Sequence, residues 1–321
     1  MIYVFALFLL TLLVITAVAI VRTENLFVAV MLTSIFSLLM AANFFILDAA
    51  DVALTEAAVG AGVTTVIFLS ALALTGDWEK PRPGGRTVAL CTVGVLAMLL
   101  IYASFDKPRL GDPEAPVHQH VAPWYLEKTP EYMVTAILSS FRGYDTLGEV
   151  FVVFAACIGV LFILGVKPAR QTAAAPQPVS GLRHHLIPQV VGRLLVPFIV
   201  LFGLYVQFHG EYGPGGGFQA GAIIATGVIL YALLEGEAEA LRAVPRSVLL
   251  ALVVGGALLY GAVGVVCMLK GGAFLDYSVL AADPVFGQQL GILVIEAGVG
   301  MAVCGALLSI FHAFAARESM T

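Results

Sequence analysis

The stretch LGILVIEAGVGMAVCGALLSIF, residues 290–311, decides the fold class of this chain. A run of about 20 apolar residues is long enough to cross a bilayer as a helix. Glu296 lies roughly 10 Å into the expected helix, and no basic residue lies within one turn of it. A carboxylate in hydrocarbon is costly unless it is protonated, paired or facing water. Glu296 is therefore a candidate for ion or proton movement; the alternative is a protonated carboxyl that only joins neighbouring helices.

The rest of the chain has the same apolar character. It is 60% apolar and 12% charged, with a mean hydropathy of +0.99, whereas a soluble domain is about 25% charged. The apolar runs are continuous and do not alternate as barrel strands do, so they predict an all-α polytopic membrane protein. The nine expected spans are residues 2–21, 26–47, 53–75, 88–105, 146–166, 193–209, 216–235, 247–269 and 289–312. The first run lacks a basic segment and a cleavage site, so we expect a retained span and not a signal peptide.

The composition also argues against several classes of protein. The net charge of −5 comes from acids spread over loops and spans, which gives no indication of a nucleic-acid partner. The four cysteines lie in apolar runs without metal-ligand spacing and are interpreted as small buried residues. We find no nucleophile–base pair, metal cluster or nucleotide site, so we expect no catalytic residues, no bound metal and no cofactor.

Basic residues predict the orientation and the module boundaries. With the N-terminus outside and the C-terminus inside, 11 of the 16 Lys and Arg residues fall in inner segments, as the positive-inside rule requires. A long outer segment, 106–145, contains a possible short interfacial helix at 131–141. An Ala/Pro/Gln-rich stretch at 167–185 is the clearest linker. The predicted organisation is a three-helix module (1–80), a two-helix module (86–168), a linker (169–190) and a four-helix module (191–316).

The motif DVALTEAAVG, residues 51–60, opens the third span. Asp51 suits the N-cap of a helix at the outer surface. Glu56 lies about one turn further in, where it is neither a cap nor the partner of a base. We interpret Glu56 as a transport residue, with a surface acid as the alternative.

The motif FRGYDTLGE, residues 141–149, opens the fifth span. Thr146 and Glu149 have the spacing of a capping box, and Arg142 and Asp145 can pair at the membrane interface. Taken alone, this motif is best explained as structural.

The motif HGEYGPGGGFQAG, residues 209–221, joins the sixth and seventh spans. No strand precedes it, so its glycine spacing does not indicate a dinucleotide site. Gly215, Gly216 and Gly217 permit a tight re-entry of the chain, and Gly217 and Gly221 have the spacing of a close helix contact. His209 lies at the edge of the motif and is either a hydrogen-bonded interfacial residue or part of a proton relay.

Glu56, Glu149 and Glu296 all lie on the outer side in the predicted orientation. We therefore hypothesise that they form part of one hydrated path in the outer half of the bilayer.

Taken together, these motifs resemble those of Mrp-type multisubunit cation/proton antiporters. Residues 51–60 and 141–149 resemble the C-terminal part of the Mrp protein MrpA, which contains modules similar to the D and E components of membrane-bound hydrogenases. Residues 214–221 resemble MrpB, which is MnhB-like. The resemblance covers nearly the whole chain and implies that Glu56 and Glu149 match acids of the family's ion path. It also revises the structural reading of Glu149, because one carboxyl can both cap a helix and serve a path. The role of Glu296 follows from the cost of burial and not from the resemblance.

The function that this resemblance implies is that of one membrane component of a sodium/proton antiporter in the inner membrane of a bacterium. MrpA normally begins with a large antiporter-like domain that this sequence does not contain, so we expect an antiporter-like partner among the other components of the complex. Transported H⁺ and Na⁺ would be the only ligands, and the sequence does not choose between the ions. The alternatives are an ion-translocating component of a redox complex, such as a membrane-bound hydrogenase or a relative of complex I, and a passive scaffold.

Overall fold

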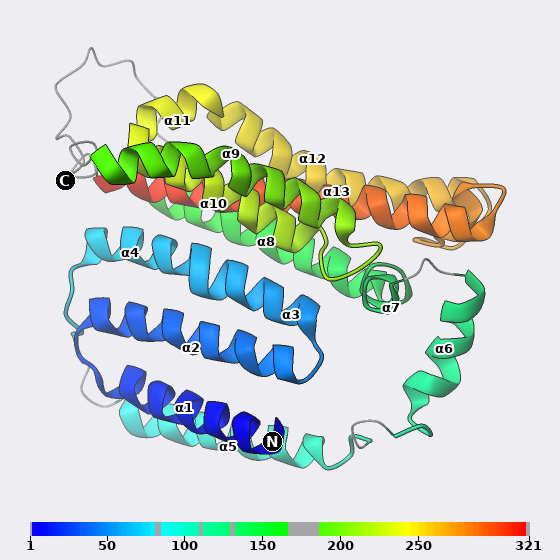
Figure 1. Ribbon diagram of the computed structural model, residues 1–321, viewed down its shortest axis with the longest axis horizontal. Coiled ribbons are helices and arrows are strands. Elements are labelled where there is room, and N and C mark those ends of the chain that lie inside the picture. The colour runs from blue at the N-terminus through cyan, green and yellow to red at the C-terminus, as the bar shows by residue number, and fades with distance from the viewer. Residues whose placement is uncertain (1, 81–84, 109–111, 129–131, 166–185, 319–321) are drawn as a thin grey trace.

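The computed structural model describes residues 2–80, 85–108, 112–128, 132–165 and 186–318 (Figure 1). Over these residues the regular structure is helical, apart from one isolated bridge between Asn25 and Trp78. Nine helices in the described ranges are long and apolar enough to cross a membrane. The prediction of an all-α, multi-pass membrane protein is thus confirmed.

The first half of the chain contains five of these spans. They are α1 (Ile2–Arg22), α2 (Leu26–Ile46), a continuous helix made of α3 (Ala50–Thr55), η1 (Glu56–Val63) and α4 (Thr64–Thr75), α5 (Arg86–Ser104) and α8 (Gly143–Leu164). The segment η1 is a π-helix in the middle of its span. Between α5 and α8 lie α6 (Pro116–Lys128), α7 (Met133–Ala136) and a second π-segment, η2 (Ile137–Phe141). The last two match the helix expected at 131–141, whereas α6 was not predicted.

The second half contains the other four spans. They are α9 (Leu186–His209), α10 (Gly217–Glu235), α12 (Arg246–Leu269) and α13 (Pro284–Glu318). The short helix α11 (Glu237–Ala243) follows α10, and a 3₁₀ turn, η4 (Tyr277–Leu280), precedes α13. Most of the expected linker, 169–190, lies outside the described residues, but its last residues already belong to α9, which is longer than the predicted span.

The 35-residue helix α13 is the centre of the fold. It packs against α12, α10, α8 and α4. Ile292, Ile295 and Val299 on α13 are buried in an apolar cluster that also includes Val63 of η1 and Val150 of α8. The same cluster therefore holds together helices from all three predicted modules.

The first helices form a layer beside this bundle (Figure 1). Helix α2 packs against α1 and η1, and η1 also contacts α10. Figure 1 shows α3, α8 and α13 beginning at the same end of the molecule, which we call the α13 N-terminal end. The acids near the starts of these helices therefore lie toward the same end of the molecule.

Candidate functional site

Glu296 lies within α13, about 18 Å along the helix axis from Pro284. Its carboxylate accepts hydrogen bonds from two other parts of the chain. The Ser139 hydroxyl, from η2, donates to Oε1. The Gly217 backbone N–H, from the first turn of α10, donates to Oε2 at 2.5 Å. Glu296 therefore joins helices that are widely separated in the sequence.

The start of α10 is shaped to receive this carboxylate. Gly216 is the N-cap and has φ +134°, a conformation that L side chains rarely adopt. A Cβ on Gly217 would lie 1.9 Å from the Glu296 carbonyl oxygen, so only glycine lets α10 approach α13 this closely. The first N–H groups of a helix lack internal partners and attract anions. The Glu296 carboxylate satisfies one of them.

Two buried tyrosines hold the chain around Ser139. The Tyr277 hydroxyl donates to the Ser139 carbonyl at 3.0 Å, and the Tyr260 hydroxyl donates to the Gly143 carbonyl at 2.8 Å. Both side chains are fully buried. Burial, reinforced by Tyr260, raises the pKa of Tyr277, so this hydroxyl remains a donor. These bonds fix the position of the π-segment that presents Ser139 to Glu296.

Asp51 is a second buried acid at the glycine-rich loop. It is 5% exposed. Its Oδ1 accepts from the Gly215 N–H at 3.0 Å, and its Oδ2 accepts from the Tyr132 hydroxyl at 2.6 Å. Burial and the contact with Asp51 raise the pKa of Tyr132, which therefore stays neutral. The expected capping role is wrong, because the N-cap of α3 is Ala49. Asp51 instead links α3 to the glycine-rich loop. The helix that follows this loop, α10, donates a hydrogen bond to Glu296.

Glu56 is the first residue of the π-segment η1 and is partly buried. Its Oε1 and the Oγ of Ser37 each lie 2.7 Å from the point where a Cβ on Gly60 would stand. Ser37, on α2, is 7% exposed. Because Gly60 has no side chain, the Glu56 carboxylate and the Ser37 hydroxyl can both lie in the space beside it. π-Segments within α-helices are frequent at functional sites.

Glu149 and its charged neighbours at the start of α8 are more exposed than Glu56. Arg142 and Asp145 form the expected ion pair, which is more than half exposed. Thr146 is not an N-cap; α8 begins at Gly143, and the Thr146 hydroxyl donates to the Leu138 carbonyl at 2.9 Å. Glu149 is exposed on the surface of this chain.

His209 and Gly221 make contacts with other parts of the chain. His209 ends α9 and stacks on Tyr205 with ring centroids 4.9 Å apart, and its Nε2 faces Gly213. A Cβ on Gly221 would lie 2.6 Å from the Gly300 carbonyl oxygen. Gly221 thus belongs, with Gly217, to the close contact of α10 with α13.

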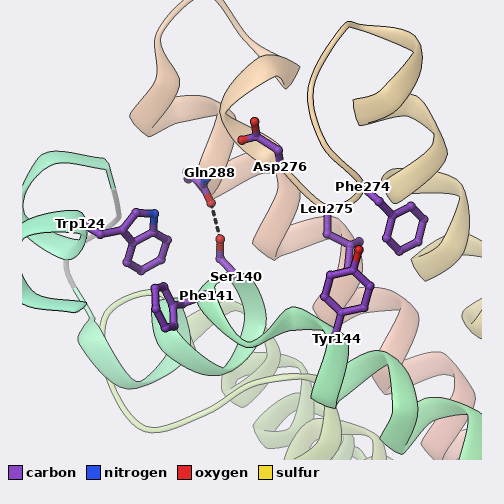
Figure 2. A pocket seen from close by; sticks show the side chains of 8 residues that line it. All are labelled: Trp124, Ser140, Phe141, Tyr144, Phe274, Leu275, Asp276 and Gln288. Carbon is purple, nitrogen blue, oxygen red and sulfur yellow. Dashed lines mark hydrogen bonds between the residues drawn. The ribbon is translucent and has the colours of Figure 1, made fainter. Parts of the chain in front are cut away.

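A cavity of about 260 Å³ lies close to the site (Figure 2). Half of its lining residues are aromatic, with Trp124 and Phe141 on one side and Tyr144 and Phe274 on the other. Between them the Ser140 hydroxyl donates to Gln288 Oε1 at 2.6 Å. Ser140 directly follows Ser139, and Gln288 lies about two turns before Glu296 on α13. The cavity therefore reaches the polar groups next to the Glu296 carboxylate.

Local sequence does not single out the donors of this site. Ser139 of η2, Tyr132 before α7 and the Gly217 N–H of α10 gain their roles only when these elements meet α3 and α13. The described residues contain no group of three or more His, Cys, Asp or Glu that could hold a metal ion.

Comparison with known proteins finds two family domains in this chain. A family described as a domain related to the MnhB subunit of Na⁺/H⁺ antiporters matches residues 187–309, and the MbhD family, from the complex abbreviated MBH, matches residues 11–77. A solved structure of the Mrp complex from Dietzia sp. DQ12-45-1b has a chain with a TM-score of 0.74 and 25% identity, and the match covers 96% of this chain. The chain thus combines an MbhD domain with an MnhB-related domain, as in an Mrp-type fusion of a C-terminal MrpA part with an MrpB part.

Other relatives match most of this chain or one part of it. A protein of Rhizobium meliloti (strain 1021), named as a probable K⁺/H⁺ antiporter component of the combined A/B type, is 27% identical over 310 residues, which is 85% of this chain. A protein of Staphylococcus aureus (strain Newman), named as the putative antiporter subunit mnhB2, is 28% identical over 137 residues, 42% of this chain and 96% of the relative. A chain of the archaeal membrane-bound sulfane sulfur reductase has a TM-score of 0.55 and 28% identity, covering 71% of this chain and 97% of that one.

The chain is much shorter than the relatives that match it most fully. It spans 30% of the length of the Rhizobium meliloti protein and 34% of the matched chain of the Dietzia complex.

Proposed function

We propose that this Mrp-type chain is a membrane subunit of a multisubunit monovalent cation/proton antiporter, and that Glu296 is a proton-binding residue of its ion path. The similarity to antiporter proteins of the combined A/B type and to mnhB2 supports the first part. The observation that carries the second is a carboxylate within a membrane span, bonded on both oxygens by donors from other helices.

The two donors suit a carboxyl that changes its protonation state. The Gly217 N–H can only donate, so it holds Oε2 as an acceptor. The Ser139 hydroxyl can donate a hydrogen bond to the charged carboxylate, or rotate and accept a hydrogen bond from the O–H of the neutral acid. Each state of Glu296 therefore keeps a hydrogen bond at both oxygens, which lowers the cost of moving between them.

The proposed route begins in the cavity of Figure 2 and passes Ser140 and Gln288 to reach Ser139 and Glu296. In the orientation favoured by the basic residues, this is the outer side of a bacterial inner membrane. Glu56 and Glu149 extend the path laterally. Because Glu149 is exposed on this chain, we propose that it faces another protein of the full complex, one that is antiporter-like.

The transported ions are H⁺ and a monovalent cation, most simply Na⁺. A hard cation prefers oxygen ligands, which the carboxylates and nearby carbonyls supply. No resident cofactor is needed for this role.

The test is antiport by the whole complex reconstituted in liposomes, with Na⁺, K⁺ and Li⁺ compared. Glu296→Gln keeps the shape of the side chain but cannot carry a proton, so antiport should be lost while assembly is retained. Glu239→Gln is the matched control, because Glu239 pairs with Arg242 on α11, away from the site. Full antiport by an assembled Glu296→Gln complex would show that Glu296 is only a packing residue.

A second candidate follows from the likeness to the sulfane sulfur reductase chain. In that case the same helices would serve a redox-driven membrane complex. Purification of the intact complex discriminates between the two. Iron–sulfur or nickel proteins in it would support the redox complex, and a large antiporter-like protein without them would support the antiporter.

A further inference from the structure

A buried histidine lies on α13, 16 residues beyond Glu296. His312 is 2% exposed. Neither of its ring nitrogens has a hydrogen-bond partner among the residues that the structure describes. A neutral imidazole carries one donor and one acceptor, and burying both unpaired is unfavourable. A neutral His312 with only a structural role would therefore lack the hydrogen-bond partners that its two buried ring nitrogens need.

The nearest charged atom belongs to an acid that reaches the surface. His312 Nδ1 lies 3.7 Å from Glu237 Oε1, and the Glu237 side chain is 25% exposed. Glu237 opens the short helix α11, directly after α10 ends. Arg246 Nη2, at the start of α12, lies 3.9 Å from the same carboxylate oxygen. Glu237 thus lies between the buried ring and water.

Among the described residues, His312 forms no ion pair besides the one with Glu237. Arg193 of α9 pairs with Glu235 of α10, and on α11 Glu239 pairs with Arg242. Helix α4 contains no ionisable residue, and Cys157 is the one ionisable side chain in the half of α8 remote from Glu149. The edge of the Phe311 ring packs near His312, with centroids 5.4 Å apart. An added proton on the ring would accordingly be balanced by Glu237.

We propose that His312 and Glu237 form a proton-exchange site at the end of α13 opposite the α13 N-terminal end. Glu237 takes a proton from water. Its O–H bond then breaks as a bond from the same proton to His312 Nδ1 forms, which leaves a carboxylate beside an imidazolium. The reverse transfer returns the proton to water. The proposal rests on the proposed function in one respect only, namely that this site exchanges the protons that the antiporter transports.

Proton uptake by the purified complex tests the site without transport. The complex is stepped from about pH 8 to about pH 5, a range that brackets the ordinary titration of histidine, and released or bound protons are followed with a dye. His312→Gln should bind up to about one proton fewer per chain than the parent complex. Equal uptake by the two complexes would overturn the proposal.

Transport supplies a second test with a variant at the surface. Glu237→Gln and His312→Gln should both shift the dependence of antiport on the pH at the α11 side of the membrane. Glu239→Gln, the neighbouring control, should leave it unchanged. If Glu237→Gln gives the parent pH profile, Glu237 is not the donor to His312 and the proposal fails. Loss of the Glu296 role would leave the uptake result intact, so the two proposals fail separately.

Discussion

Gly217→Ala should separate Glu296 from the helix that holds one of its oxygens. The new Cβ would lie 1.9 Å from the Glu296 carbonyl oxygen and 2.8 Å from the Gly300 nitrogen. Both atoms belong to the backbone and cannot rotate away. Helix α10 would have to retreat by about 1.5 Å to restore ordinary contact. That shift would lengthen and break the 2.5 Å bond from the Gly217 N–H to Oε2.

The expected loss has two parts. Overpacking of a tight contact costs about 1–3 kcal/mol, and a hydrogen bond to a charged group contributes about 1.5–3 kcal/mol. Since about 1.4 kcal/mol corresponds to a factor of ten, the variant should lose more than tenfold in antiport rate.

The assay is antiport in vesicles, with assembly of the complex followed on native gels. Gly261→Ala is the matched control, because a Cβ on this α12 residue meets no atom within 4 Å. It should behave like the parent. Normal antiport by a normally assembled Gly217→Ala complex would refute the role given to the close contact of α10 and α13.

Three further changes test other parts of the site. Ser139→Ala removes the hydroxyl that faces Oε1 of Glu296, and it should lower antiport about tenfold or more at unchanged assembly. Gly60→Ala places a methyl group 2.7 Å from the Glu56 carboxylate oxygen and should impair antiport by displacing it. Burial raises the pKa of Glu211, so the folded chain binds this proton more tightly than the unfolded chain and loses stability as the pH rises. Glu211→Gln should therefore flatten the fall in thermal stability as the pH rises above about 4.

Each of these has an outcome that contradicts it. Ser70→Ala, which removes a hydroxyl that donates to the Val66 carbonyl of its own helix α4, is the control for Ser139→Ala; equal effects of both changes would deny a special role to Ser139. Unchanged antiport in Gly60→Ala would mean that the position of the Glu56 carboxylate does not matter. An unaltered pH dependence in Glu211→Gln would assign the loss of stability to other groups.

Much of the fold could be predicted because apolar length is a local property. Each of the nine spans is a run that must lie in lipid, and the structure places a helix at every one. The importance of Glu296 also followed from local sequence, since the cost of burying a carboxylate does not depend on which helix lies beside it. The length of α13 was underestimated, because its polar ends extend beyond the apolar run.

The partners of the acids could not be predicted in this way. Asp51 looked like a cap, because an acid before an apolar run usually is one, yet tertiary contacts with Tyr132 and Gly215 give it a buried role. Ser139 became a ligand of Glu296 through a π-segment that local sequence does not reveal. His312 was not considered at all, because its burial depends on how α11 packs beside α13.

The central claim is that the carboxyl of Glu296 changes its protonation state during transport. Infrared difference spectra of the intact complex, recorded across the pH range in which it transports, measure this directly when the parent is compared with Glu296→Gln. The account predicts a protonated-carboxyl band that is absent from the variant and whose intensity changes over that range. A band of constant intensity, or no band that depends on Glu296, would contradict it.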